Sequence, residues 1–157
     1  MQLTLYTDYS LRVLIYLALK ADQPATIGEI ATYYGISRNH LVKVVHNLGL
    51  SGFVHSTRGK HGGLRLARPA DQINVADVVR NTEPNFNVVG CFDAQADPCS
   101  AGPVCALKPL LSEALASFLA VLGQRTVAQL IKPGVQWSPV QLSGTLATAL
   151  SANTKNA

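Results

Sequence analysis

Residues 26–50, TIGEIATYYGISRNHLVKVVHNLGL, decide the fold of this 157-residue chain. Thr26, with Glu29 three residues later, forms the capping-box pattern that starts a short helix. Gly35 is suited to end that helix in a left-handed conformation, and Ser37 is placed to cap a second helix. The inward positions of the second helix have helical spacing: Leu41, Val44, Val45 and Leu48. Two helices joined by a short turn that contains glycine predict a helix-turn-helix.

A wing is predicted directly after this motif. Residues 53–57 and 64–67 have the composition of two β-strands, and the glycine-rich basic segment 58–63, RGKHGG, joins them. Glycines let a hairpin tip adopt conformations that other residues avoid, so the tip can follow a groove closely. The segment matches neither the Walker pattern nor the dinucleotide-binding pattern. Residues 1–70 therefore predict a winged helix-turn-helix DNA-binding domain.

The rest of the chain is expected to divide into three parts. Residues 71–106 hold a linker helix, capped by Asn74, and a loop with the cysteines. Residues 107–132 hold a long helix and a short last helix that Thr126 opens. The tail, 133–157, is expected to be partly disordered. The predicted fold class is mainly α with a small β-hairpin, a winged helix-turn-helix followed by a long dimerisation helix.

The long helix is apolar on more than one side. Leucine and phenylalanine recur at helical spacing from Leu107 to Leu122, and a second apolar row includes Leu110 and Val121. A helix this apolar must be covered on more than one face. A small winged domain offers little to cover it, so we expect it to form a dimer interface. An ordinary core helix is the alternative.

Positive charge is clustered on the predicted DNA-reading part. The net charge is only +4, but no acidic residue lies between Glu29 and Asp71. That interval holds all four histidines and the basic residues Arg38, Lys43, Arg58, Lys60, Arg65 and Arg68. A clustered basic face is typical of nucleic-acid binding, although a simple solvated face is the bland alternative. The candidate DNA-binding residues are Ser37, Arg38, Asn39, His40, Lys43, Arg58, Lys60 and His61.

These residue types suit different parts of DNA. The first turns of a recognition helix meet base edges in the major groove. Arg38 suits guanine and Asn39 suits adenine, because each side chain can make two hydrogen bonds to that base. Lys43, Arg58 and Lys60 are better suited to phosphates or the minor groove.

Three cysteines, Cys91, Cys99 and Cys105, are the only ones in the chain and lie in an acidic loop rich in glycine and proline. An odd number fits poorly with a disulfide framework, and no secretory segment or long apolar run is visible, so a cytoplasmic protein with reduced thiols is expected. Buried cysteines that act as small hydrophobes are one reading. Structural zinc is another, although no close Cys-x-x-Cys pair occurs. An iron–sulfur cluster tolerates the wider spacing.

Four stretches together resemble the nitric-oxide-sensing NsrR repressors, a branch of the winged-helix iron–sulfur repressor family that also includes IscR. They are residues 8–16, 35–43 and 58–66, and Val78-Val79-Arg80 with Glu83-Pro84. The resemblance covers about residues 1–132. It implies a homodimer that binds palindromic double-stranded operator DNA, with no enzymatic activity and no membrane association. It also implies a cluster, 4Fe–4S or alternatively 2Fe–2S, held by Cys91, Cys99 and Cys105.

The resemblance also bears on the fourth ligand and on the signal. IscR-like members add a histidine soon after the third cysteine, whereas this chain has none after His61. In NsrR-like members the ligand is a carboxylate from the partner subunit, which matches Asp8. We expect the first helix to start at Thr7 or Asp8 and to end near Ala21. Asp8 would then also be a good N-cap of that helix. Other candidates for the ligand are Glu83, Asp93, Asp97 or a small molecule.

The resemblance implies that nitric oxide, by attacking the cluster, lifts repression of detoxification genes. Three alternatives stay open: an IscR-like regulator of iron–sulfur biogenesis or redox status, an iron–sulfur electron carrier or enzyme subunit, and a winged-helix DNA-binding protein with zinc or no metal. The wing and the absence of a nucleophile–base arrangement count against the carrier or enzyme.

Overall fold

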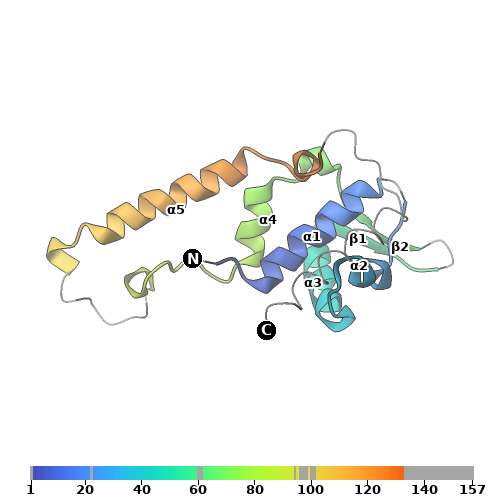
Figure 1. The fold of residues 1–157 in the computed structure, drawn as a ribbon, viewed down its shortest axis with the longest axis horizontal. Coiled ribbons are helices and arrows are strands. Elements are labelled where there is room, and N and C mark those ends of the chain that lie inside the picture. Colours follow the sequence, from blue (N-terminus) through green and yellow to red (C-terminus); the bar gives the residue numbers. More distant parts are fainter. Residues whose placement is uncertain are drawn as a thin grey trace, which may run out of the picture.

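The structure is a computed structural model that describes residues 2–21, 23–59, 62–93, 95, 99 and 102–132. Its helices and strands follow in the order α1 (Leu5–Leu19), α2 (Ile27–Tyr34), α3 (Arg38–Leu50), β1 (Val54–Thr57), β2 (Gly63–Leu66), α4 (Val75–Thr82) and α5 (Leu107–Gly123). Short 3-10 turns lie between and after them: η1 (Ala70–Gln72), η2 (Gly90–Phe92), η3 (Gly102–Val104) and η4 (Val127–Leu130). The chain is mainly helical with a small hairpin, as the sequence predicted (Figure 1).

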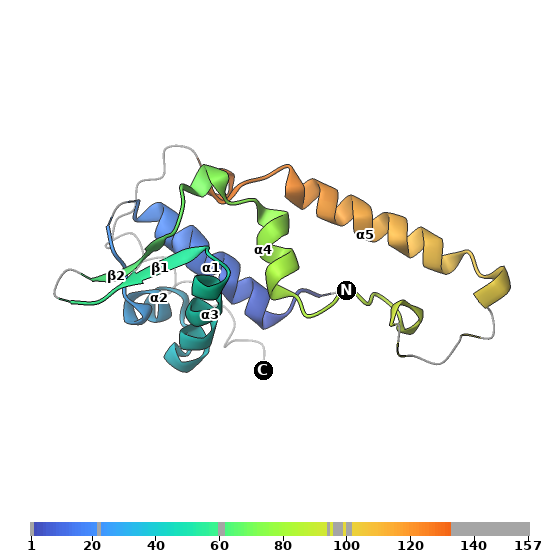
Figure 2. The ribbon, with the colours of Figure 1, turned by 180° about the vertical axis from the view of Figure 1, so that it is seen from behind.

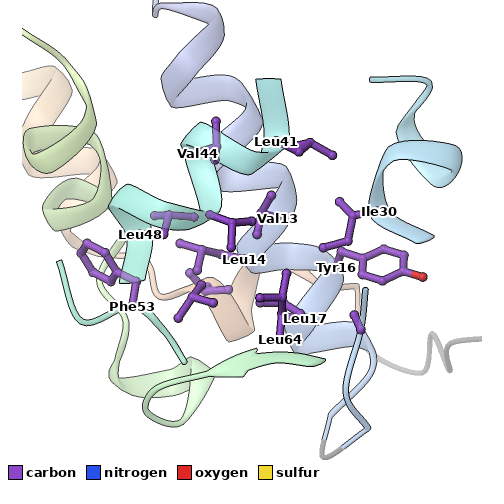
Figure 3. Close-up of a cluster of buried hydrophobic side chains, with 14 of the residues drawn as sticks. Val13, Leu14, Tyr16, Leu17, Ile30, Leu41, Val44, Leu48, Phe53 and Leu64 are labelled. Carbon is purple, nitrogen blue, oxygen red and sulfur yellow. The ribbon is translucent and has the colours of Figure 1, made fainter. Parts of the chain in front are cut away.

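Helix α1 is the centre of the hydrophobic core. It contacts α2, α3, α4, β2 and η4. The largest fully buried side chains come from most of these elements and include Leu14, Leu17, Ile30, Leu41, Leu48, Phe53 and Ile73. In Figure 3 the side chains of α1 and α3 meet, with Phe53 at one edge of the cluster. Burying each leucine or phenylalanine contributes about 1.5–3 kcal/mol relative to leaving it exposed, so the winged-helix part has a core of its own.

The capping residues of the helix-turn-helix are mostly those that the sequence predicted. The Thr26 hydroxyl accepts a hydrogen bond from the Glu29 N–H at 3.1 Å, and the Glu29 carboxylate accepts one from the Thr26 N–H. Gly35 ends α2 at a φ of 63°, in the left-handed region. The side-chain cap predicted at Ser37 is wrong. Ser37 occupies the N-cap position, but its carbonyl, rather than its hydroxyl, accepts the hydrogen bonds from His40 and Leu41.

The first helix starts earlier than the sequence predicted. It begins at Leu5 because Thr4 caps it, with the Thr7 N–H donating to the Thr4 hydroxyl at 3.2 Å. Asp8 therefore lies in the first turn, and its reading as an N-cap is wrong. The helix ends at Leu19, before Ala21, which adopts a φ of 51°.

The two later helices keep their predicted caps. Asn74 caps α4 through a hydrogen bond from the Ala76 N–H at 2.9 Å. The short helix that Thr126 opens has the predicted start, but it is the 3-10 turn η4.

The wing is an antiparallel pair within one residue of the predicted strands. Val54 pairs with Leu66, and Thr57 pairs with Gly63. The buried Leu64 extends this pairing beyond the hairpin: its N–H donates to the Ala25 carbonyl at 2.7 Å, and the Ala25 N–H donates back at 3.0 Å. The base of the wing is therefore joined to the segment between α1 and α2.

The end of α5 and the residues just after it are attached to this body through a small set of hydrogen bonds. The Val75 N–H donates to the Arg125 carbonyl at 3.0 Å, and the Val127 N–H donates to the Ile73 carbonyl at 2.9 Å. The Asn74 side-chain amide donates to a carbonyl at the end of α5 at 2.7 Å. These hydrogen bonds hold the C-terminal end of α5 firmly against the start of α4.

Helix α5 extends from that attachment away from the winged-helix part (Figure 2). None of its residues is buried, and Leu107, Leu110 and Val121 have exposed fractions of 49%, 61% and 62%. The alternative of an ordinary core helix is therefore wrong for the described part of this protomer. No helix within the described ranges combines the length and apolarity needed to cross a membrane.

Candidate functional site

The recognition helix α3 presents one apolar face and one polar face. Leu41, Val44, Val45 and Leu48 are buried, as predicted. The opposite face carries the candidate DNA-binding residues Ser37, Arg38, Asn39, His40 and Lys43, all of them exposed. Since the first four of these precede or begin the helix, its N-terminal end can approach the major groove with its donors unobstructed. The Ser37 hydroxyl makes no cap hydrogen bond and is available to a phosphate.

The wing places further positive charge beside α3. Arg58 is exposed just after β1, while Arg65 is half-buried on β2. The guanidinium carbon of Arg68 lies 5.0 Å from the centre of the Phe53 ring, so this arginine packs on an aromatic face of the core. Lys60 and His61, predicted at the wing tip, lie outside the described residues.

Helix α1 touches the recognition helix through an aromatic contact. The rings of Tyr9 and His40 are stacked, with centroids 6.3 Å apart and an interplanar angle of 25°. Tyr9 follows Asp8 in the sequence, whereas His40 lies on the first turn of α3. The N-terminal part of α1 and the N-terminal end of α3 are therefore in direct contact.

A second connection runs from Asp8 to the end of α2. Both carboxylate oxygens of Asp8 bind Arg12 at 2.9 Å, one to Nε and one to a terminal nitrogen. The Arg12 guanidinium in turn lies 5.7 Å from the ring centre of Tyr34. Burial raises the pKa of Tyr34 above its ordinary value, so this ring stays a neutral partner. Asp8 itself remains accessible, with 39% of its side chain exposed.

The three cysteines lie far from the wing, along the segment between α4 and α5 (Figure 1). Cys91 belongs to η2 and Cys105 follows η3, and both are half-buried, whereas Cys99 is exposed. All three are free thiols. Within the described ranges, no three Cys, His, Asp or Glu side chains lie close enough together to hold a metal ion. In one protomer, therefore, the three cysteines do not form a metal-binding group, either with one another or with Asp8.

The donor set nevertheless fits an iron–sulfur cluster. Three free thiols in one segment can supply three thiolate ligands, and Cys91 and Cys105 lie at or just after short 3-10 turns. Structural zinc sites are usually built from four cysteine or histidine ligands in close pairs, whereas this segment offers three widely spaced cysteines and no histidine. The reading of the cysteines as buried small hydrophobes is wrong, since none of them is buried.

An ion pair between the buried Lys20 and the partly exposed Glu29 fixes the corner between α1 and α2. Lys20, whose side chain is only 5% exposed, donates to Glu29 at 2.8 Å and to the Pro24 carbonyl at 3.1 Å. Partial burial acts to raise the pKa of Glu29, but hydrogen bonds from Lys20 and Thr26 outweigh it and hold the pKa below its usual value. The corner thus keeps α2 in place behind the recognition helix.

Some residues that connect these parts were not expected from the sequence. The contacts of Tyr9 with His40 and of Arg12 with Tyr34 join different helices. Glu83 accepts hydrogen bonds from Thr4, 79 positions earlier. Only the Asp8–Arg12 pair carried a local signature, because residues four apart on a helix face one another.

Comparison with known proteins agrees with this geometry. Residues 3–133 match the model of the Rrf2 family, described as iron-dependent transcriptional regulators. The HTH-type transcriptional regulator NsrR of Bacillus subtilis (strain 168) is 51% identical over 135 residues, which cover 84% of this chain and 91% of that protein.

Solved structures share the fold. CymR, the global cysteine regulator of B. subtilis, superposes with a TM-score of 0.64 at 26% identity, over 84% of this chain and 99% of that chain. IscR of T. potens reaches a TM-score of 0.66 over 90% of this chain and 96% of that chain. Its identity of 22% makes it a likeness of fold alone.

Proposed function

Since this chain belongs to the Rrf2 family of iron-dependent transcriptional regulators, we propose that it is a repressor whose iron–sulfur cluster senses nitric oxide. The observation that carries the proposal is the pairing of an exposed, basic recognition helix with three free thiols in one accessible segment. The identity of 51% to a regulator named NsrR supports it, and so does the resemblance of residues 8–16, 35–43 and 58–66 to nitric-oxide-sensing repressors. The protein acts as a regulator in the cytoplasm, where thiols stay reduced, and not as an enzyme.

The DNA-binding unit of the proposal is a homodimer. Residues 1–70 form the reading head, with Arg38 and Asn39 for base edges and Lys43, Arg58, Lys60 and His61 for the backbone or the minor groove. Helix α5 forms the dimer contact, since none of its residues is buried in one protomer. The short helical turn η4 after it packs on the core of the same protomer through Val127. Two reading heads related by a two-fold axis match a palindromic operator. Residues 133–157 form a tail without an assigned role.

The cluster-binding unit is the segment 71–106. Cys91, Cys99 and Cys105 would hold three irons of a 4Fe–4S cluster, with 2Fe–2S as the alternative, and Asp8 of the partner subunit would be the fourth ligand. When bound, the cluster supplies iron sites that nitric oxide can attack. Asp8 is suited to its role because its carboxylate is accessible on the first turn of α1.

Two contacts support the route from Asp8 to DNA. Arg12 holds the Asp8 carboxylate in this protomer and stacks on Tyr34, one residue before the turn into α3. Tyr9 stacks on His40 of the recognition helix. A change in what the Asp8 carboxylate binds therefore alters the first turn of α1, and both contacts pass this change to the helix-turn-helix.

The direct test is an anaerobic titration of the cluster-loaded protein with nitric oxide while operator binding is followed. We expect a brown protein whose visible absorption and operator affinity fall together. A colourless protein that holds zinc would overturn the cluster, and operator binding that ignores nitric oxide would overturn the signal. Loss of affinity on iron chelation or oxidation alone would point to the IscR-like alternative.

The fourth ligand has its own test in Asp8→Asn. Asparagine keeps the size of the side chain but lacks the anionic carboxylate. We expect the apo protein to remain folded, while its loaded cluster becomes more labile and its spectrum and nitric-oxide response change. Unchanged spectrum, lifetime and response would show that the ligand lies elsewhere, among Glu83, Asp93, Asp97 or a small molecule.

A further inference from the structure

A hydrogen-bonded junction joins the start of α1 to the end of α4. One carboxylate oxygen of Glu83 accepts two hydrogen bonds from Thr4, from the backbone N–H at 2.8 Å and from the hydroxyl at 3.0 Å. Beside it, the buried Thr7 hydroxyl donates to the Thr82 hydroxyl at 2.9 Å. Hydrogen bonds to an ionised carboxylate are stronger than those between neutral groups. The hydrogen bonds from Thr4 to Glu83 are therefore expected to be stronger than hydrogen bonds between neutral groups at a surface.

The junction stands between the two parts of the proposed sensor. On one side, the carbonyl of Thr4 accepts the N–H of Asp8 at 3.0 Å, so Thr4 fixes the turn that carries Asp8. On the other side, Glu83 ends α4 and is followed by the stretch that leads to Cys91. A short chain of hydrogen bonds thus connects the base of the cysteine segment to the backbone of Asp8.

The junction lies at the open edge of the contact between α1 and α4. A cavity of about 230 Å³ lies next to it, lined by the N-terminal residues, the stretch after Glu83 and Leu115 of α5. Farther in, α1 and α4 pack on each other through buried residues such as Val78. Loss of the Glu83 hydrogen bonds would therefore loosen the N-terminal cap of α1 while the packing of the two helices stays in place.

We infer that Glu83 is a positioning residue for Asp8: its carboxylate clamps the N-terminal cap of α1 to the end of α4 and so sets where Asp8 is presented. In this protomer a single oxygen of the Glu83 carboxylate accepts both hydrogen bonds from Thr4. The clamp itself is independent of the proposed function, whereas its effect on the cluster rests on that function.

The clamp is tested first in the protein without its cluster, by residue-resolved amide hydrogen exchange. In Glu83→Ala, the amides of Thr7, Asp8 and Tyr9 should exchange about tenfold faster, the effect expected for a weakened cap and a lost charge-assisted hydrogen bond. The amides of residues 44–48 in α3 should keep their rates. Glu83→Gln, which retains an acceptor oxygen, should fall between Glu83→Ala and the parent. Glu113→Ala, which removes an exposed glutamate from α5, should match the parent.

Two results would overturn the clamp. Unchanged exchange at the first turn of α1 would show that Thr4 caps the helix without Glu83. Equal acceleration of all amides, including those of α3, would show that Glu83 supports only the global stability of the protein. If Glu83→Ala does not fold, the intermediate variant Glu83→Gln decides between the same outcomes.

The effect on the cluster is tested by a double-mutant cycle. Glu83→Ala should shorten cluster lifetime and change the visible spectrum in the same direction as Asp8→Asn. Added to Asp8→Asn, it should change neither further, because a residue that acts through Asp8 has nothing left to position. Additive effects of the two variants would show that Glu83 does not act through Asp8. A parent protein that binds no cluster would instead refute the proposed function and leave the exchange result standing.

Discussion

The winged-helix body buries its apolar side chains within one protomer, whereas helix α5, in the half of the chain that follows α4, does not. The body places Leu14, Leu41 and Leu48 at exposed fractions of 1% or less around α1. Helix α5 buries none of its residues, although it is one of the most apolar stretches of the chain. The difference teaches that the winged-helix body closes its core within one protomer, whereas α5 leaves apolar surface that the proposed dimer would cover.

The largest expected effect is on the free energy of unfolding, and it distinguishes the winged-helix body from helix α5. Leu48→Ala should lower the free energy of unfolding by about 2–5 kcal/mol, because it leaves a cavity in a closed core. The matched change Leu110→Ala on α5 should leave the concentration-independent stability nearly unchanged and should instead weaken the dimer. Chemical denaturation at several protein concentrations, with sedimentation for the dimer, measures both. Equal losses of stability that do not depend on concentration would show that α5 belongs to the core after all.

The next effect concerns the cysteine segment. Cys99→Ala should abolish visible cluster absorption but leave a folded, soluble dimer, because neither the core of the body nor α5 depends on a metal. Operator affinity should fall by about 5–150-fold, the usual range of coupling between two sites. Circular dichroism, sedimentation and operator titration check these three outcomes. An unfolded or monomeric variant would mean that the site is structural instead of sensory.

Within the reading head, two exposed residues should behave differently on DNA. Arg38→Ala should cost about 1–3 kcal/mol at one base position and relax the preference there. Lys43→Ala should weaken binding to all sequences alike and should reduce the salt slope by about 2, because the dimer loses one phosphate contact in each protomer. Titrations of operator and random DNA at several salt concentrations distinguish them. Equal weakening of operator and random DNA by Arg38→Ala would remove this residue from base reading.

The smallest effect lies at the corner between α1 and α2. The pKa of Glu29 is held below its ordinary value of 4.5, so its contribution to stability is present above pH 4.5 and is lost as the pH falls through the folded value. Glu29→Gln should lower stability at pH 7 by about 1 kcal/mol or less, because Glu29 is 41% exposed. The gap between variant and parent should close below about pH 4.5. A gap that stays constant down to pH 3 would mean that the charge of Glu29 contributes nothing.

The sequence predicted the parts of this fold that local chemistry determines. The capping box at Thr26, the left-handed Gly35 and the inward face of α3 are set by residues a few positions apart, and the structure confirms them. The start of α1 was misplaced because Thr4 and Asp8 are both favoured N-cap types four residues apart, and the contact that supports Thr4, with Glu83, lies 79 positions away. No local pattern reports such a contact.

The candidate sites were predictable to different degrees. The exposure of Arg38, Asn39 and Lys43 followed from helical periodicity. The gathering of three cysteines and a partner carboxylate depends on a cluster and a second chain, so one protomer does not display it, and the metal ligands stay a prediction. The stacking of Tyr9 on His40 could not be predicted, because the packing of α1 against α3 determines it.

The attachment of α5 to the start of α4 bears on how such a regulator could acquire a new operator. In the proposed dimer, hydrogen bonds between residues 73–75 and 123–127 set the angle at which each reading head leaves the shared helices. Changes in the bases that are read would then arise on α3, whereas changes in the separation of the two half-sites would arise at this attachment. The base sequence of each half-site and the spacing between half-sites would thus be determined by different parts of the chain. Each could change in evolution while the other stays fixed.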